Sequence, residues 1–250
     1  MKNSKLHYFT VPVLLLLLWT IIVSLKLISP LFVPHPIDVL NAAVQLFADG
    51  EIYSDIGYTL FRTLIGFAIA AIVGIPIGLL MGYSERIYHS LEFVVEFFRS
   101  IPATALFPLF LLFFGVGDQS KIALAAWSAG LVLVVNSMYG VHLSKELRIK
   151  AARTMNVKGL ELFQKVIFPE ALPQIFNGIR VAISLSLIIV VVAEMFVGTT
   201  YGLGRLIIDS QLVYRVPEMY AAIFLTGVIG FVLNKAVIYA EKRVVHWKGK

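Results

Sequence analysis

Residues 149–163 read IKAARTMNVKGLELF and stand between two of the most apolar stretches of the chain. The segment carries Lys150, Arg153, Lys158 and Glu161, and most of its residues favour helix formation. Unpaired charges are costly in an apolar environment, so this segment is expected to face water. The apolar stretches before and after it are expected to lie out of water.

The composition places the chain among membrane proteins. Hydrophobic residues make up 59% and charged residues 14% of its 250 residues, and the mean hydropathy is +0.87, values unlike those of soluble domains. Apolar runs near twenty residues long match a bilayer core of about 30 Å at about 1.5 Å rise per residue. We therefore expect an all-α integral membrane fold.

Six apolar runs, bounded by charge, Gly and Pro, are predicted to cross the membrane as helices. The third run holds Pro102 and Pro108, so a kink is expected there. The first is interpreted as a retained anchor because it is long and no small-residue cleavage site follows it before Pro30. The runs are 8–28, 58–83, 101–116, 121–142, 174–197 and 218–240.

Basic residues are distributed unevenly between the segments that join these runs. Cytoplasmic segments retain Lys and Arg, so we expect both termini in the cytoplasm. This orientation also explains the pI of about 9.5 without nucleic-acid binding. The inner side then receives Lys2, Lys5, Arg86, Arg99, Lys145, Arg148, Lys150, Arg153, Lys158, Lys165, Lys242, Arg243, Lys248 and Lys250. The outer side receives Asp38, Asp49, Glu51, Asp55, Asp118, Asp209 and Glu218, with Lys26, Lys121, Arg205 and Arg215.

The opening segment belongs to a predicted cytoplasmic loop, 143–173, between the fourth and fifth runs. Its first half ends at Asn156, a residue able to adopt the left-handed conformation that closes a helix. Its second half restarts after Gly159 with apolar residues at helical spacing, before Pro169 and Pro173 interrupt. Two short helices with a sharp joint are expected.

The joint admits two interpretations. Its charges are consistent with a solvated loop that only fixes topology. Four apolar residues around the joint favour instead a surface that docks on another protein. They are Val157, Leu160, Leu162 and Phe163.

Three stretches resemble one protein family. Residues 151–195, AARTMNVKGLELFQKVIFPEALPQIFNGIRVAISLSLIIVVVAEM, look like the cytoplasmic loop and following span of permease subunits from bacterial binding-protein-dependent ABC importers. Residues 99–122, RSIPATALFPLFLLFFGVGDQSKI, and 59–82, TLFRTLIGFAIAAIVGIPIGLLMG, are similar to two further spans of its nitrate, sulfonate and taurine group. The likeness covers most of the chain from about Pro34 onward.

The resemblance implies a type I importer permease with six transmembrane helices and a cytoplasmic coupling loop at 143–173. Its domains would be an N-terminal anchor, 1–33, and a transmembrane domain, 54–241. In this family a short helix at the joint, here roughly 151–160, rests in a groove of a separate ATPase subunit. The implied coupling residues are Lys150, Ala151, Ala152, Arg153, Met155, Asn156, Val157, Lys158, Gly159, Leu160 and Phe163.

Two positions depart from the family motif of Glu-Ala-Ala, three residues, Gly. Lys150 stands for the Glu and Asn156 for the Gly. Asn replaces Gly best at a positive backbone angle, so the turn is expected to survive. The reversed charge at Lys150 leaves open whether the ATPase contact uses the usual polar pairing.

The implied partners are ATPase subunits, an extracytoplasmic solute-binding protein, a second permease copy and the lipid bilayer, with no nucleic acid. The second copy is expected to be identical, because symmetric assemblies are the commonest. ATP and Mg²⁺ would be used by the ATPase, and no cofactor is expected in this chain, whose GVGDQSK at 115–121 lacks P-loop spacing. The implied location is the bacterial cytoplasmic membrane.

Ionisable residues within spans need a partner or a purpose. Glu194 and Arg62 both fall in the outer halves of their predicted spans and could pair, either as a structural ion pair or as part of the translocation pathway or its gate. Arg180 is expected to extend towards the cytoplasmic headgroups. Lys235 is left open between a helix partner and a cavity.

Ser100, Pro102 and Thr104 are further pathway candidates, because prolines near a span end free backbone carbonyls; a simple kink is the alternative. Small residues at four-residue spacing, from Gly66 to Gly78, predict close helix packing. The chain has no Cys, and its five His residues lack metal-ligand spacing, so neither a catalytic nor a metal site is predicted.

Two rival classes compete with the importer permease. An ion-driven secondary transporter would be expected to show inverted repeats, and a membrane enzyme a catalytic motif; neither is evident. The implied solute is a small anion such as an aliphatic sulfonate, taurine, nitrate or bicarbonate. A pyrimidine or flavin nutrient is the alternative solute.

Overall fold

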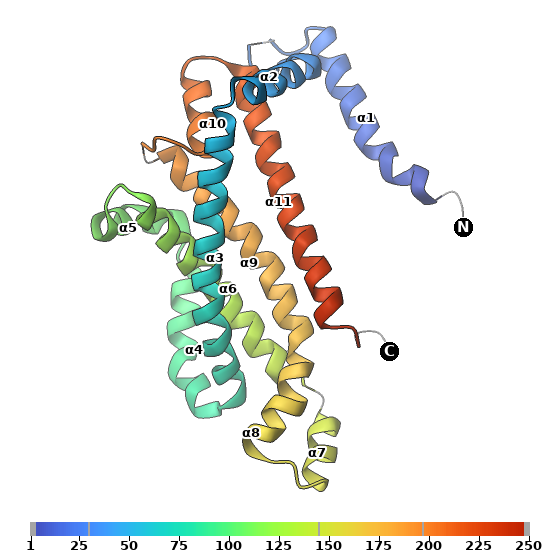
Figure 1. Cartoon of the computed structure of the whole chain (residues 1–250), viewed down its shortest axis with the longest axis vertical. Helices are drawn as coiled ribbons and strands as arrows, with labels where there is room; N and C mark the ends of the chain where they lie inside the picture. Colours follow the sequence, from blue (N-terminus) through green and yellow to red (C-terminus); the bar gives the residue numbers. More distant parts are fainter. Residues whose placement is uncertain (1–3, 30, 145, 197, 248–250) are drawn as a thin grey trace. The chain divides into compact units, whose positions relative to one another are not determined.

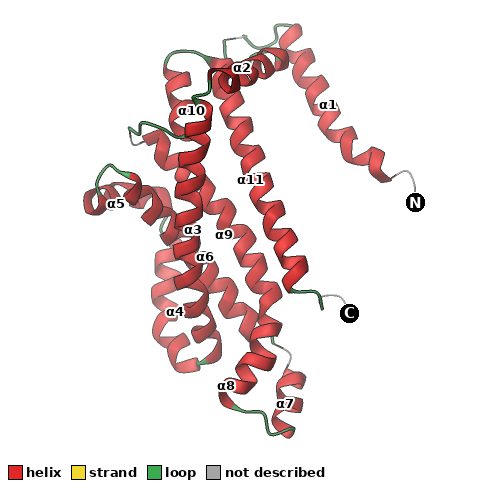
Figure 2. Cartoon of the chain, in the orientation of Figure 1, coloured by secondary structure: helices red, strands yellow, loops and turns green. Residues whose placement is uncertain are grey.

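The computed structural model describes residues 4–29, 31–144, 146–196 and 198–247, which form helices joined by short turns, with no strand among them (Figure 1; Figure 2). The all-α prediction is confirmed. In chain order the elements are α1 Ser4–Ser24, α2 Pro36–Asp49, α3 Ile52–Tyr83, α4 Glu85–Ser100, η1 Ala103–Leu106, α5 Phe107–Phe114, α6 Asp118–His142, α7 Glu146–Thr154, α8 Gly159–Leu162, η2 Phe163–Ile167, α9 Phe168–Phe196, α10 Leu203–Leu212 and α11 Val216–Val244.

Four helical stretches among the described residues are long and apolar enough to cross a bilayer: α3, α6, α11 and the continuous stretch Gly159–Phe196. A fifth crossing results by the same criteria only if α4 and the segment Ala103–Phe114 are counted as one broken span. The apolar part of α1, Thr10–Ser24, is shorter than these. The structure thus supports four or five spans by length and composition, and the predicted count of six is not matched.

The third predicted span, 101–116, is wrong as a single crossing. Its helical part is bent by 88° from α4, which occupies a segment that the sequence indicated as a loop. Ile101 has extended backbone, because the residue before a proline is sterically excluded from the helical region. Pro108 lies in the first turn of α5, where a missing N–H removes no helical hydrogen bond.

The fifth predicted span, 174–197, begins earlier than expected, and Pro169 and Pro173 do not interrupt it. Helix continues from Gly159 to Phe196 through η2, a π turn in which the Phe168 N–H donates to the Phe163 carbonyl. In a regular α-helix the ring of Pro169 would crowd the carbonyl four residues earlier, in Lys165. That carbonyl lies in the wider π turn, so the helix can pass the proline.

The chain divides into two compact units. Unit 1 comprises Met1–Tyr58 and Thr200–Val228, and contains α1, α2 and α10. Within it Trp19 stacks on Phe224, with ring centroids 5.8 Å apart, and its Nε1 donates to the Pro34 carbonyl at 3.1 Å. Asp55 accepts a hydrogen bond of 2.7 Å from the Gly202 N–H.

Unit 2 comprises Thr59–Thr199 and Ile229–Lys250, and contains α4 to α9. Within it α6 and α9 pack against each other along their lengths. The glycines of α3 lie against α6, as the small-residue spacing predicted. A Cβ built on Gly78 would lie 2.2 Å from the Val134 carbonyl oxygen, and one on Gly74 would lie 2.7 Å from that of Gly130. Larger side chains at these positions would push the helices apart.

Some sequence predictions lie outside the described residues. They concern Lys2, Lys145, Val197, Lys248 and Lys250.

Candidate functional site

The joint predicted after Asn156 exists and is built as a Schellman motif. Asn156 has a φ of 63°, in the left-handed region that Asn tolerates better than other non-glycine residues. Its N–H donates to Arg153 at 3.0 Å, and the Val157 N–H donates to Ala152 at 3.0 Å. These two bonds satisfy the last carbonyls of α7 and end the helix at Thr154.

The chain turns again at Gly159, whose φ of 57° favours glycine, and α8 begins there. The expected short helix over 151–160 is therefore wrong. That range holds the end of α7, a non-helical turn and the start of α8, because two positive-φ residues interrupt the helical backbone. We call residues 151–163 the elbow.

The apolar residues of the elbow divide into an inner and an outer set. Leu162 is buried, and Val157 and Phe163 pack against the same cluster as Ala152 and Ala171. These three therefore anchor the elbow, contrary to the expectation that they form an exposed docking surface together with Leu160. Leu160 remains outward, 70% exposed, and Met155 joins it at 78%.

Two ion pairs brace one side of the elbow. Arg148 Nη1 lies 2.5 Å from Glu170 Oε1 and ties α7 to α9. Lys165 Nζ lies 2.7 Å from Glu161 Oε1 along the continuous helix. The basic residues of the elbow itself, Arg153 and Lys158, are exposed, as is Lys150 just before it. The elbow thus presents positive charge beside two exposed apolar side chains.

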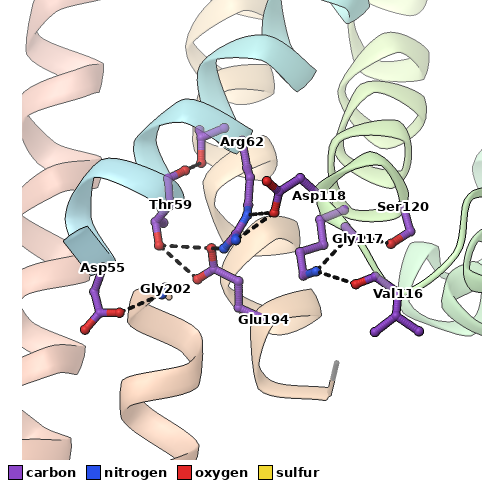
Figure 3. A network of polar contacts seen from close by, with 11 residues as sticks. Asp55, Thr59, Arg62, Val116, Gly117, Asp118, Ser120, Glu194 and Gly202 are labelled. Carbon is purple, nitrogen blue, oxygen red and sulfur yellow. Dashed lines mark hydrogen bonds and ion pairs between the residues drawn. The ribbon is translucent and has the colours of Figure 1, made fainter. Parts of the chain in front are cut away.

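A buried charge network lies elsewhere in unit 2, where α3, α6 and α9 meet (Figure 3). Arg62 Nη1 lies 2.5 Å from Glu194 Oε1, and Arg62 Nη2 lies 2.7 Å from Asp118 Oδ1. The Thr59 hydroxyl lies 2.9 and 3.0 Å from the two Glu194 oxygens. Arg62 is 3% and Glu194 1% exposed, so both charges are held out of water. The predicted pairing of Arg62 with Glu194 is confirmed.

Lys121 is a second buried cation near the start of α6, 1% exposed. Its Nζ donates to the carbonyls of Val116 and Gly117, at 3.3 and 3.0 Å. These carbonyls belong to the turn between α5 and α6, so the lysine closes that turn. From the sequence, Lys121 was expected at the outer end of a span, and its role in this turn was not predicted.

Ser100, Pro102 and Thr104 are not part of the charge network. The Ser100 hydroxyl donates to the Glu96 carbonyl at 2.9 Å, along its own helix. Pro102 precedes η1 at the bend after α4. Thr104 lines a mainly apolar cavity of about 390 Å³ with Leu124, Ala193 and other residues of α5, α6 and α9.

Sequence reasoning missed Thr59 and Asp118 as members of the network. Thr59 precedes Arg62 by three residues, and thus shares its face of the helix, a spacing that could have drawn attention to it. Asp118 opens α6, whereas its charge alone had indicated an outer loop.

Arg180 and Lys235, which the sequence also singled out, lie within the spans. The Arg180 Nε is buried without a hydrogen-bond partner in the described part of the chain. Lys235 lies over the ring of Phe231, 5.2 Å from its centroid, so its contact is within its own helix.

Known proteins are similar in sequence to this chain. A family model described as "Binding-protein-dependent transport system inner membrane component" matches residues 74–246. The taurine transport system permease protein TauC of Escherichia coli (strain K12) is 30% identical over 254 residues, covering 100% of this chain and 92% of TauC. The nitrate import permease protein NrtB of Synechocystis sp. is 29% identical over 221 residues, covering 85% of this chain and 80% of NrtB.

The fold is also found in a solved structure. A chain of the MetNI methionine ABC transporter, in an inward-facing conformation, superposes with a TM-score of 0.68 at 20% identity and covers 77% of this chain and 95% of that one. The predicted type I importer permease fold is thereby confirmed. The chain belongs to the binding-protein-dependent transport system inner membrane component family, within the sulfonate, taurine and nitrate group of ABC importer permeases.

Proposed function

We propose that this permease subunit forms the translocation pathway for a small anion, with an aliphatic sulfonate such as taurine as the first candidate. The support is the similarity to TauC along the entire chain. Nitrate is the next candidate because NrtB is similar over 85% of the chain, and bicarbonate belongs to the same class of small anions. A pyrimidine or flavin nutrient remains the alternative solute.

Transport is driven by a separate ATPase subunit, which uses ATP and Mg²⁺ and contacts the elbow; this chain hydrolyses no ATP. One observation carries the mechanism: the second half of the elbow, residues 159–163, and Glu194 belong to a single helical stretch, Gly159–Phe196. A displacement of the elbow is transmitted along that stretch as a rigid body, because packed helices move as units. The elbow residues from Lys150 to Phe163 that the family resemblance singled out act in this contact.

The Arg62–Glu194 pair acts as a latch of the outer gate in this mechanism. It joins α3 to α9, so a movement of α9 relative to α3 must break or shift buried hydrogen bonds. Ser100, Pro102 and Thr104 are proposed to line the pathway near the bend after α4. Of these, Thr104 already faces a cavity.

The assembly is proposed as two identical permease chains, two ATPase subunits and an extracytoplasmic binding protein in the bacterial cytoplasmic membrane. Both termini, and the loop 143–173, lie in the cytoplasm. Within each permease chain, residues 1–33 form an anchor and residues 54–241 form the transmembrane domain. The binding protein docks on the outer segments 30–56 and 199–217.

Co-purification and reconstitution test this function. The chain is purified in mild detergent, and proteoliposomes are prepared with the ATPase subunit that accompanies it, the binding protein, and taurine as the first solute. We expect uptake only with ATP on the ATPase side. Uptake driven by an ion gradient without the ATPase would instead establish a secondary transporter.

A further inference from the structure

A cavity of about 1070 Å³ opens on one side of the elbow, within unit 2. The elbow supplies Arg153, Lys158 and Leu162 to its lining. The opposite wall, from the ends of α3 and α6 and the start of α4, includes Tyr83, Glu85 and His142. The cavity is therefore bounded by positive charge on the elbow and by one carboxylate across from it.

Arg153 and Lys158 differ from the other basic residues around them. Arg148 and Lys165 are held by Glu170 and Glu161. For the side chains of Arg153 and Lys158, the described residues supply neither an ion pair nor a hydrogen bond. Two cations that line one cavity repel each other, and among the described residues Glu85, on the same lining, forms an ion pair with neither. An external anion would relieve that repulsion.

Exposed apolar residues alternate with these two cations along the chain. Met155 lies between Arg153 and Lys158, and Leu160 follows, at 78% and 70% exposure. Apolar side chains that remain exposed at a corner of the chain mark contact surfaces, and binding hot spots lie in well-packed, desolvated pockets. A free inorganic anion would satisfy the cations and leave Met155 and Leu160 uncovered.

The place of the elbow favours a protein over lipid headgroups. Figure 1 shows α7 and α8 at one end of unit 2, beyond the end of α4. With the loop 143–173 in the cytoplasm, as proposed, a partner that reaches the elbow approaches from water.

We propose that Arg153 and Lys158 bind a carboxylate of the ATPase subunit in this cavity, while Met155 and Leu160 fill an apolar pocket beside it. The inference rests on the proposed function and specifies its partner: the groove that receives this elbow is acidic. Glu85 repels the incoming carboxylate from the far wall and so directs it to the elbow. An ATPase with a basic groove is rejected by like charge.

Binding measurements with single charge-neutralised variants test the inference. The purified chain, in detergent, is titrated with the ATPase subunit that co-purifies with the wild type, at low and high salt. We expect R153Q and K158Q each to weaken binding about tenfold or more at low salt, with a smaller difference at high salt. K242Q is the matched control, because it removes one exposed charge near the end of α11, outside the elbow, and should bind like the wild type.

The outcomes separate the alternatives. Wild-type binding by both R153Q and K158Q overturns the inference and leaves the proposed function standing. An equal loss in E85Q also overturns it, because the cavity would then close on its own carboxylate. Loss of binding to anionic phosphatidylglycerol vesicles, with ATPase binding unchanged, assigns the cations to lipid and likewise overturns it. If no ATPase accompanies the wild-type chain, the proposed function itself fails.

Discussion

Arg62 and Glu194 show what a buried charge requires of a membrane helix. Both side chains are almost fully removed from solvent, and desolvation costs several kcal/mol per ion. Thr59 and Asp118 supply further hydrogen bonds, which offset that cost only while both charges are present. Loss of one member leaves an uncompensated buried charge. Removing one member therefore lowers the stability of the fold by more than the intact pair contributes to it.

Replacing Arg62 or Glu194 singly by Ala should lower the free energy of unfolding by about 3–5 kcal/mol. The double variant R62L/E194L should recover most of this loss, because two apolar side chains need no counterion. Asp118 tolerates the change because its side chain is 39% exposed and can be hydrated. Denaturant unfolding in detergent, followed by tryptophan fluorescence, measures these differences.

Transport by the double variant then decides the role of the pair. A stable R62L/E194L chain that no longer imports solute supports the latch. Normal import by the same chain would show that the pair contributes to helix packing and not to transport. A double variant as unstable as the single ones would contradict the electrostatic explanation itself.

Asn156 offers a second test at the residue scale, because its φ of 63° closes α7. Asn156→Gly should fold and couple like the wild type, whereas Asn156→Val should lose about 1–2 kcal/mol and disturb the elbow. Thr154→Val, two residues earlier in helical backbone, is the control. ATPase stimulation in the reconstituted complex measures coupling, and equal behaviour of Asn156→Val and Thr154→Val would contradict this role.

At the scale of elements, the α3–α6 contact depends on the absence of side chains. A Cβ on Gly78 would lie 2.2 Å from the Val134 carbonyl oxygen, a separation that backbone atoms cannot relieve without moving a helix. The Gly57 position, on the same helix, has no atom within 4 Å of an added Cβ. Gly78 is therefore required for the close approach of α3 to α6, whereas packing does not require a glycine at position 57.

Gly78→Ala should destabilise the chain by about 1–3 kcal/mol, as overpacking does in a close helix contact. Gly57→Ala should be neutral or stabilising by up to about 1 kcal/mol, because Ala favours helix. Thermal unfolding of the two variants in one detergent gives the comparison. An equal effect of both would show that helix propensity, and not packing against α6, governs these positions.

The elements also show where the sequence was informative. The span predicted at 121–142 became Asp118–His142, because long apolar runs must form helices in lipid. The kink in the third run was predicted from its prolines, and the bend of 88° lies where Ile101 precedes Pro102. The helix α4 was missed, because it carries enough charge to resemble a loop. At the site, the Arg62–Glu194 pair was predictable because isolated intramembrane charges need partners. Thr59 is neutral and carried no such signal.

At the scale of the whole molecule, the continuous stretch Gly159–Phe196 gives the proposed mechanism its physical basis. Its 38 residues extend about 57 Å at about 1.5 Å per residue, enough to link an aqueous end to the opposite half of a bilayer. Glu194, near one end, holds α3 and Leu162, near the other, anchors the elbow. Motion of the ATPase can thus reach the latch without a separate relay.

Orientation in the membrane can be tested with two engineered cysteines, because the chain contains none. Met155→Cys in the elbow and Val213→Cys in the predicted outer segment replace side chains that are 78% and 57% exposed, so neither change should disturb packing. A membrane-impermeant maleimide should label the M155C variant only in inside-out vesicles and the V213C variant only in right-side-out vesicles. Bound ATPase should protect the M155C thiol and leave the V213C thiol reactive. Labelling of M155C from outside would place the elbow beyond the reach of any cytoplasmic ATPase, and the proposed coupling could not operate.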